Sequence, residues 1–165
     1  MKVILLCGKI CSGKSYFAEK LVEERNAVLL SCDEAYCSIF PDRHEGLLEE
    51  EMNRIKAYLY RKSLDILKTG TEVILDFGFW SRTERERINR YYDYNGVETE
   101  WHFVDVSDEV WERNIERRNR RIRKGLSKDF YLDDAMLEKL MSTFEKPERE
   151  EMDYWHENID KAEIE

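Results

Sequence analysis

Residues 8–15 read Gly8-Lys9-Ile10-Cys11-Ser12-Gly13-Lys14-Ser15 and match the pattern Gly-x4-Gly-Lys-Ser/Thr at every fixed position. The apolar run 2–7 precedes this stretch, as expected of a strand that is buried on both faces. Apolar residues then recur on one helical face from position 14 to about 24. A strand, a glycine-rich turn and a helix in this order predict a loop that binds phosphate.

Each fixed position of this loop has a physical reason. Gly8 and Gly13 let the backbone turn so that successive N–H groups point into one concavity, and the helix N-terminus adds partial positive charge there. Lys14 supplies a full charge to the β and γ phosphates of a nucleotide, and the Ser15 hydroxyl is placed to bind Mg²⁺. A glycine-rich turn without a ligand is the alternative, and the flanking strand and helix argue against it.

Composition narrows the class of protein. The chain has 165 residues, of which 42% are hydrophobic, and its 27 Lys and Arg against 36 Asp and Glu give a net charge of −9. This balance argues against a protein that coats nucleic acid or an anionic membrane. No apolar run is long enough to span a membrane, and the apolar start is too short for a signal peptide. We therefore expect a single domain over 1–165 in the cytoplasm, with the oligomeric state open.

The four cysteines fit that compartment. Cys7, Cys11, Cys32 and Cys37 all lie in the first quarter of the chain, and their spacing differs from the C-x2-C pairs of zinc ribbons. We interpret them as reduced thiols, mostly buried, rather than as a metal site. Because Cys11 lies inside the phosphate loop, redox sensitivity of the site stays open.

Short apolar runs alternate with longer amphipathic stretches, which favours a parallel α/β sheet. Predicted strands lie at 2–7, 27–30, 73–75 and 98–106, and a further strand is expected at 159–164. Predicted helices run over 14–24, 48–67, 81–92 and 135–144, one follows Ser107, and one is expected to open at Pro147.

Two carboxylates follow predicted strands, where the carboxyl ends of parallel strands form a ligand crevice. Asp76 ends the third strand and is a candidate Mg²⁺ ligand, directly or through water, although such a residue can instead cap the next loop. Asp33 follows the second strand and could accept a proton from an acceptor hydroxyl. A helix N-cap or a solvated acid is the alternative for Asp33.

A basic cluster stands out in this acidic chain: Arg113, Arg117, Arg118, Arg120, Arg121, Arg123 and Lys124. Arginine stabilises a transferring phosphoryl group through bidentate contacts, and we expect one or two of these residues to serve phosphate. Helical spacing places Arg117 and Arg121 on one face with Arg118 beside them. Intrahelical ion pairs on a solvated helix, or nucleic-acid binding, are the other interpretations.

The phosphate loop, the segment Ser31-Cys32-Asp33-Glu34, the stretch 73–82 and the arginine-rich helix occur in the order seen in small P-loop kinases. The chain resembles the P-loop AAA-domain predicted kinases, which are related to polynucleotide 5′-kinase, chloramphenicol phosphotransferase and zeta toxins. This resemblance implies a three-layer α/β fold, with a parallel sheet of order 2-3-1-4-5 and an arginine-rich lid at about 113–130. It also implies ATP as the nucleotide, Asp33 as the base and Arg117 or Arg121 as the lid arginine, and we assign Arg118 to nucleotide binding.

One departure from the family bears on the acceptor. Polynucleotide 5′-kinases continue their aspartate motif as Asp-Asp-x-Arg, whereas here the segment reads Asp33-Glu34-Ala35-Tyr36. Arg43 could substitute for the missing arginine. We expect an ATP- and Mg²⁺-dependent phosphotransferase that acts on a small-molecule hydroxyl. A nucleotide hydrolase or switch is the first alternative, and a 5′-hydroxyl nucleic-acid kinase is the second.

Overall fold

Strands and helices alternate along the chain in the computed structural model, which describes residues 1–40, 49–127 and 131–157. The strands are β1 (Lys2–Cys7), β2 (Val28–Ser31), β3 (Val73–Gly78), β4 (Glu98–Asp105) and β5 (Tyr154–Glu157). The helices are α1 (Lys14–Arg25), α2 (Cys32–Ile39), α3 (Glu49–Leu67), α4 (Arg82–Tyr94), α5 (Asp108–Arg123) and α6 (Asp134–Met141), and a 3₁₀ turn, η1, covers Arg149–Glu151.

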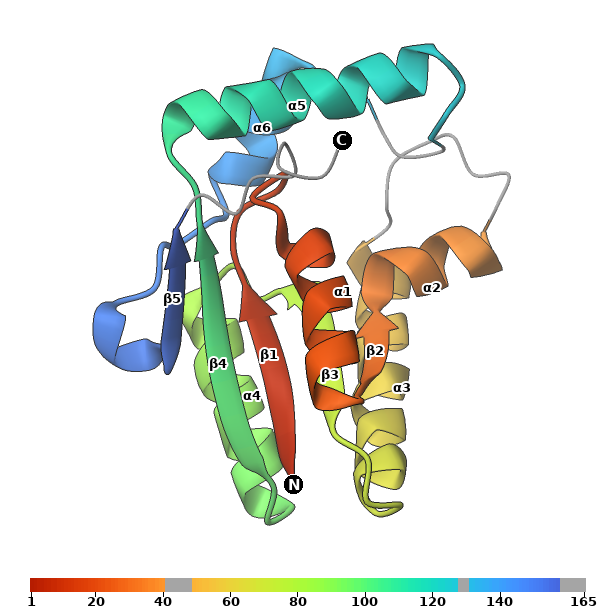
Figure 1. Ribbon diagram of the computed structural model, residues 1–165, viewed down its shortest axis with the longest axis vertical. Coiled ribbons are helices and arrows are strands. Elements are labelled where there is room, and N and C mark those ends of the chain that lie inside the picture. The colour runs from red at the N-terminus through yellow and green to blue at the C-terminus, as the bar shows by residue number, and fades with distance from the viewer. Residues whose placement is uncertain (41–48, 128–130, 158–165) are drawn as a thin grey trace.

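The five strands form one parallel sheet in the order β2-β3-β1-β4-β5, which confirms the expected topology (Figure 1). The central strand β1 pairs on both sides, so that Leu5 lies between Leu75 of β3 and Trp101 of β4. All the carboxyl ends therefore meet at one edge of the sheet. The loops that follow β1 and β3 and the start of α2, which directly follows β2, lie at that edge, where a ligand crevice is expected.

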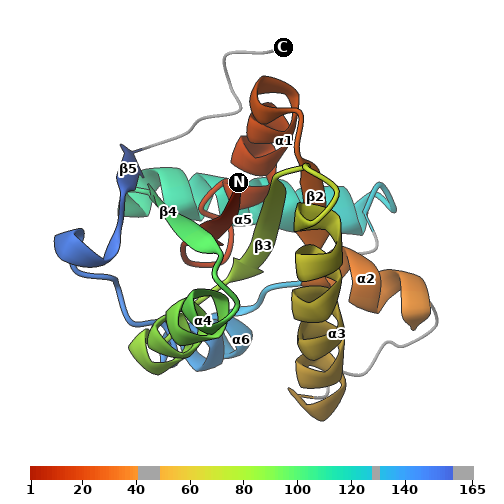
Figure 2. The ribbon, with the colours of Figure 1, turned by 90° about the horizontal axis from the view of Figure 1, so that it is seen from below.

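Helices cover both faces of the sheet and so give the predicted three layers. Helix α1 lies on one face, whereas α3 and α4 lie on the other (Figure 2). Helix α5 crosses above the carboxyl ends of the strands (Figure 1). This position brings the arginine-rich helix over the phosphate loop.

The core follows the two-residue alternation of β1. Val3, Leu5 and Cys7 point into the larger apolar cluster on the α3 and α4 side, whereas Ile4 and Leu6 point into the smaller cluster beneath α1. All five side chains are completely buried. A strand buried on both faces explains why this stretch is continuously apolar, and it holds the phosphate loop on a rigid support.

One helix was missed, one expected helix is wrong, and other expectations concern residues outside the described part of the chain. Helix α2 was missed: the Ser31 hydroxyl caps it by accepting from the Glu34 amide, directly after β2. The helix expected at Pro147 was wrong, because a capping box between Glu148 and Glu151 closes only the single turn η1. The last described strand is β5; the segment 159–164 lies outside the described residues, as do Arg43 and part of the expected lid.

Candidate phosphate-binding and phosphoryl-transfer site

The phosphate loop is tightly built at both glycines. A Cβ atom at position 8 would lie 2.7 Å from Ser12 Oγ and 2.8 Å from the Val104 carbonyl, so only glycine fits. Gly13 has φ = 98°, a left-handed conformation that glycine adopts without strain, and it places Lys14 at the first position of α1. The Lys14 ammonium group donates to the carbonyls of Gly8 and Lys9 at 2.9 and 2.8 Å. The lysine is therefore folded over the loop that it is expected to serve.

The two candidate Mg²⁺ ligands are in direct contact. Ser15 Oγ donates a 2.9 Å hydrogen bond to Asp76 Oδ2, although the two residues lie 61 positions apart. Asp76 is 8% exposed at the end of β3, so its carboxylate is held in one place. A hydroxyl and a carboxylate are oxygen donors of the kind that Mg²⁺ prefers. The donor set beside the loop thus fits a magnesium ion bound to nucleotide phosphates.

Asp33 lies in the first turn of α2, beside the Mg²⁺-type pair. The N-cap of that helix is Ser31 and not Asp33. Charged groups act on Asp33 from other elements. Burial and the negative charge of Asp76 raise the pKa of Asp33, while Lys14 and Arg118 act in the opposite direction. The residue nevertheless exposes part of its surface to solvent. Asp33 is therefore accessible to a ligand and lies among the groups that the sequence assigned to phosphate.

The arginine cluster divides along α5. Arg117 and Arg118 are half-buried, whereas Arg121 is exposed. Of the three, Arg118 acts on the pKa of Asp33, which places its guanidinium within electrostatic reach of the site. Arg118 is therefore the arginine of this helix whose charge is linked to Asp33.

Sequence reasoning missed the role of three side chains that contact the phosphate loop. Trp80 Nε1 donates to the Gly8 carbonyl at 3.0 Å, Trp111 Nε1 to the Ile10 carbonyl at 2.7 Å, and Asn114 Nδ2 to the Cys11 carbonyl at 3.0 Å. No short motif marks such donors, because each comes from a distant part of the chain.

Tyr36 does not offer a stacking surface. Its side chain is 1% exposed, and its hydroxyl donates to Glu51 Oε2 at 3.2 Å. The ring instead packs against Phe40, with centroids 5.0 Å apart. Tyr36 therefore belongs to the core between α2 and α3.

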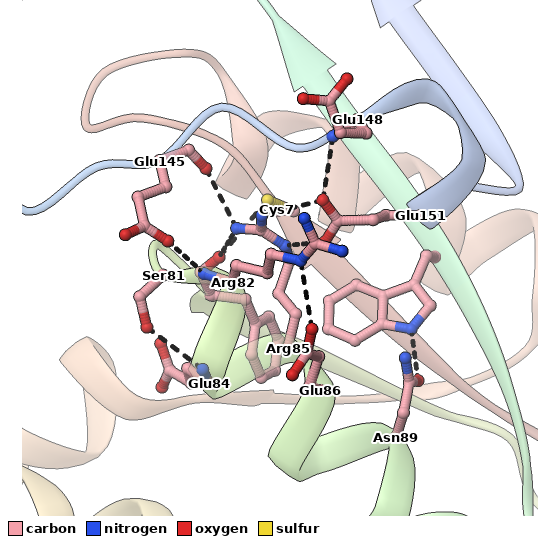
Figure 3. Close-up of polar contacts among 12 residues, drawn as sticks. Cys7, Ser81, Arg82, Glu84, Arg85, Glu86, Asn89, Glu145, Glu148 and Glu151 are labelled. Atoms are coloured by element: carbon pink, nitrogen blue, oxygen red, sulfur yellow. Dashed lines mark hydrogen bonds and ion pairs between the residues drawn. The ribbon is translucent and has the colours of Figure 1, made fainter.

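A buried arginine holds the segment that follows β3 (Figure 3). Arg85 is 2% exposed; its guanidinium donates to the carbonyls of Phe79, Trp80 and Glu145 and to both carboxylate oxygens of Glu151. Phe79 has φ = 47°, an uncommon conformation for a bulky residue. Arg85 thus fixes the turn that carries Trp80 to the phosphate loop.

The cysteines are free thiols, as expected. Burial raises the pKa of Cys7 to about 12 and also raises that of Cys32, so neither forms a thiolate near neutral pH. Among the described residues no group of three or more His, Cys, Asp or Glu side chains is arranged to hold a metal ion. None of the described helices is both long enough and apolar enough to cross a membrane.

The sheet order and the loop geometry define a P-loop protein with the α/β fold of small kinases. Residues 3–147 match the family described as an AAA domain. The chain belongs to this family. A comparison with curated protein sequences finds no match.

Solved structures share the fold over nearly the whole chain. A protein from Chloroflexus aurantiacus superposes with a TM-score of 0.74 at 20% identity, covering 99% of this chain and 91% of that one. A gluconokinase from Sinorhizobium meliloti gives 0.67 at 16% identity, covering 99% and 86%. An APS kinase from Mycobacterium tuberculosis, in complex with AMPPNP and APS, gives 0.67 at 17% identity, covering 96% and 89%. At these identities the likeness establishes the fold alone.

Proposed function

We propose that this protein is a Mg²⁺- and ATP-dependent phosphotransferase that acts on the hydroxyl group of a small molecule. The contact between Ser15 Oγ and Asp76 Oδ2, with Asp33 beside it and Lys14 over the loop, carries the proposal. These side chains combine phosphate binding, metal binding and a candidate base at one edge of the sheet. The small-molecule kinases among the structural neighbours support the same class of reaction.

Each residue has a defined part in this reaction. Lys14 and the loop amides would hold the β and γ phosphates, and Ser15 and Asp76 would hold Mg²⁺, which neutralises charge on the phosphates when bound. The oxygen of the acceptor hydroxyl would form a bond to the γ-phosphorus while the bond between the γ-phosphorus and the β-phosphate oxygen breaks. Asp33 would accept the proton that this hydroxyl loses. Arg118, Arg117 or Arg121 would stabilise charge on the transferring group. The products are ADP and a phosphate ester.

A raised pKa suits Asp33 to the role of base. A carboxylate that binds its proton more tightly than usual is a stronger base, provided that the working pH still leaves it ionised. Burial and Asp76 shift its pKa in this direction, while Lys14 and Arg118 keep the ionised form accessible. Glu34, the next residue on the same helix, is exposed and provides a reference carboxylate for testing this role.

The charge of the chain supports a small acceptor. A net charge of −9 repels a polynucleotide, and the segment Asp33-Glu34-Ala35-Tyr36 lacks the arginine that meets the substrate phosphate in polynucleotide 5′-kinases. Tyr36, at the position of that arginine, is buried in the core. Position 36 of α2 therefore offers no cationic side chain to an acceptor.

The test is transfer of labelled γ-phosphate from Mg-ATP, with and without a pool of nucleosides, sugars, aminoglycosides, chloramphenicol-like compounds and 5′-hydroxyl oligonucleotides. We expect a labelled product that requires the pool, and we expect Asp33→Asn to keep nucleotide affinity while transfer falls about 10²–10⁴-fold. Glu34→Gln is the matched control and should transfer normally. Label released as free phosphate at the same rate without the pool supports a hydrolase, and unchanged transfer by Asp33→Asn removes that residue from the mechanism.

A further inference from the structure

The carbonyl groups of residues 8–11, the first half of the phosphate loop, all accept hydrogen bonds. Side-chain N–H groups of Trp80, Trp111 and Asn114 donate to the carbonyls of residues 8, 10 and 11. The remaining carbonyl, that of Lys9, accepts from the Ser12 amide at 3.2 Å and from Lys14 Nζ at 2.8 Å. Three donors from two distant segments thus converge on four consecutive residues.

These bonds determine where the loop amides point. In a planar trans peptide the C=O group and the next residue's N–H group point in opposite directions. A donor that holds the Gly8 carbonyl therefore turns the Lys9 amide to the other side, and the bond to the Ile10 carbonyl does the same for the Cys11 amide. Cys11 has φ = 58°, so the backbone needs such outside support to keep this conformation.

Trp80 has a second effect, because it donates to the same carbonyl as Lys14, the lysine of the phosphate loop. The Gly8 carbonyl accepts from both Trp80 Nε1 at 3.0 Å and Lys14 Nζ at 2.9 Å. When Lys14 turns to a phosphate group, the carbonyl keeps its bond to the indole. The carbonyl of the buried Gly8 then still has a hydrogen-bond donor, which lowers the cost of releasing the lysine.

Trp111 and Asn114 have a second effect as well, because they belong to the arginine-rich helix α5. Their bonds dock the first half of α5 on the loop, and the Lys9 ammonium lies 4.2 Å from the centre of the Trp111 ring. Arg118 follows Asn114 by one helical turn and so lies on the same face. The distance between the loop and Arg118 is therefore set by these two anchors.

We propose that Trp80, Trp111 and Asn114 are positioning residues that hold the loop amides ready for phosphate, and that Trp111 and Asn114 also place Arg118. This inference rests on the proposed function, since it assigns parts of the same site. Trp80 acts on the loop alone. The two α5 residues act on the loop and on the arginine, so their loss affects both nucleotide binding and the transfer step.

The test compares single variants that each remove one donor: Trp80→Phe, Trp111→Phe and Asn114→Leu. Trp101→Phe is the matched control, because Trp101 Nε1 donates to Asn89 Oδ1 at 2.7 Å, away from the loop. Calorimetric Kd values for Mg-ADP and Mg-AMPPNP should rise about 3- to 10-fold in the three variants and stay unchanged in Trp101→Phe. At saturating ATP, kcat should fall further in Trp111→Phe and Asn114→Leu than in Trp80→Phe.

The outcomes separate this inference from the proposed function. Kd values for all three variants within about twofold of the control overturn the positioning role. Equal kcat for Trp80→Phe and the two α5 variants overturns the placement of Arg118. If the wild-type protein binds both nucleotides but transfers no phosphate to any acceptor, the proposed function fails, and the Kd comparison still decides the positioning role. If Trp111→Phe does not fold, Asn114→Leu still tests the contact between α5 and the phosphate loop, because Asn114 is half-buried on the same helix.

Discussion

Ser15, in the first turn of α1, and Asp76, in strand β3, form a hydrogen bond of 2.9 Å. Ser15 follows the loop after β1, and Asp76 lies near the end of β3, which pairs directly with β1. A parallel pairing brings both residues to the same edge, so the bond is a direct consequence of the strand order. The proposed metal site therefore depends on the sheet topology as much as on the two residues.

Replacing Lys14 should remove the response of the protein to nucleotide. In the wild type, a nucleotide at about 100 times its Kd should raise the free energy of unfolding by about 2.7 kcal/mol. Lys14→Met loses the charge that holds the β and γ phosphates, so we expect little or no rise. Thermal denaturation with and without Mg-ADP measures the difference, and Lys20→Met, an exposed change on the same helix, should respond normally. A wild-type response in Lys14→Met contradicts the phosphate-loop assignment.

The arginines of α5 should differ in their contribution to transfer. Arg118→Ala should lower kcat by about 10³-fold or more, because an arginine that stabilises the transferring phosphoryl group contributes on this scale. Arg117→Ala and Arg121→Ala should have smaller effects, and the exposed Arg120→Ala should have none. Steady-state kinetics on the identified acceptor provides the measurement. A larger loss in Arg117→Ala or Arg121→Ala would assign the phosphate contact to that residue instead.

Arg85 should be a major source of stability. Its replacement by Met leaves Glu151 without its partner at 2.7 Å and frees three backbone carbonyls, so we expect a loss of about 3–5 kcal/mol in the free energy of unfolding. Arg82→Met is the matched control: Arg82 pairs with Glu86 on the exposed face of α4, and such a pair contributes at most about 1 kcal/mol. Urea denaturation distinguishes the two, and similar losses would show that Arg85 is not the hub of this network.

Stability should fall as the pH falls through the histidine range. His102 Nδ1 in β4 and His156 Nε2 in β5 lie 3.0 Å apart, and both rings contact Phe17 of α1. Burial lowers both pKa values from 6.5, despite the bond from His102 to Glu100. The unfolded chain therefore binds protons near pH 6.5 that the folded pair does not bind, which favours unfolding.

Urea midpoints measured from about pH 7.5 down to about pH 5.5 should decrease, and they should decrease less in His156→Gln. Arg25, Lys2 and Asp153 also lie near this pair, and their carboxylate partners raise the pKa values of Arg25 and Lys2 further above that range. A midpoint that is constant or rises on acidification contradicts the prediction.

Much of the fold could be predicted because its signals are local. The apolar run 2–7, the glycines of the phosphate loop and the Ser81 cap of α4 each act within a few residues, and the structure confirms all three. The prediction of a helix at Pro147 was wrong for a local reason as well: the capping box between Glu148 and Glu151 closes only the single turn η1. Helix α2 was missed because its cap, Ser31, is also the last residue of β2, so that no loop separates the strand from the helix.

The sequence by itself determined the phosphate loop, the two candidate carboxylates Asp33 and Asp76 and the alternating α/β pattern, because these depend on residue type and short spacing. Only the tertiary structure decided which distant side chains support the loop. Trp80 and Trp111 lie 72 and 101 positions from the carbonyls to which they donate, and Glu151 lies 66 positions from Arg85. Such contacts form when the sheet order and the path of α5 bring these segments together, and no spacing along the chain encodes that meeting.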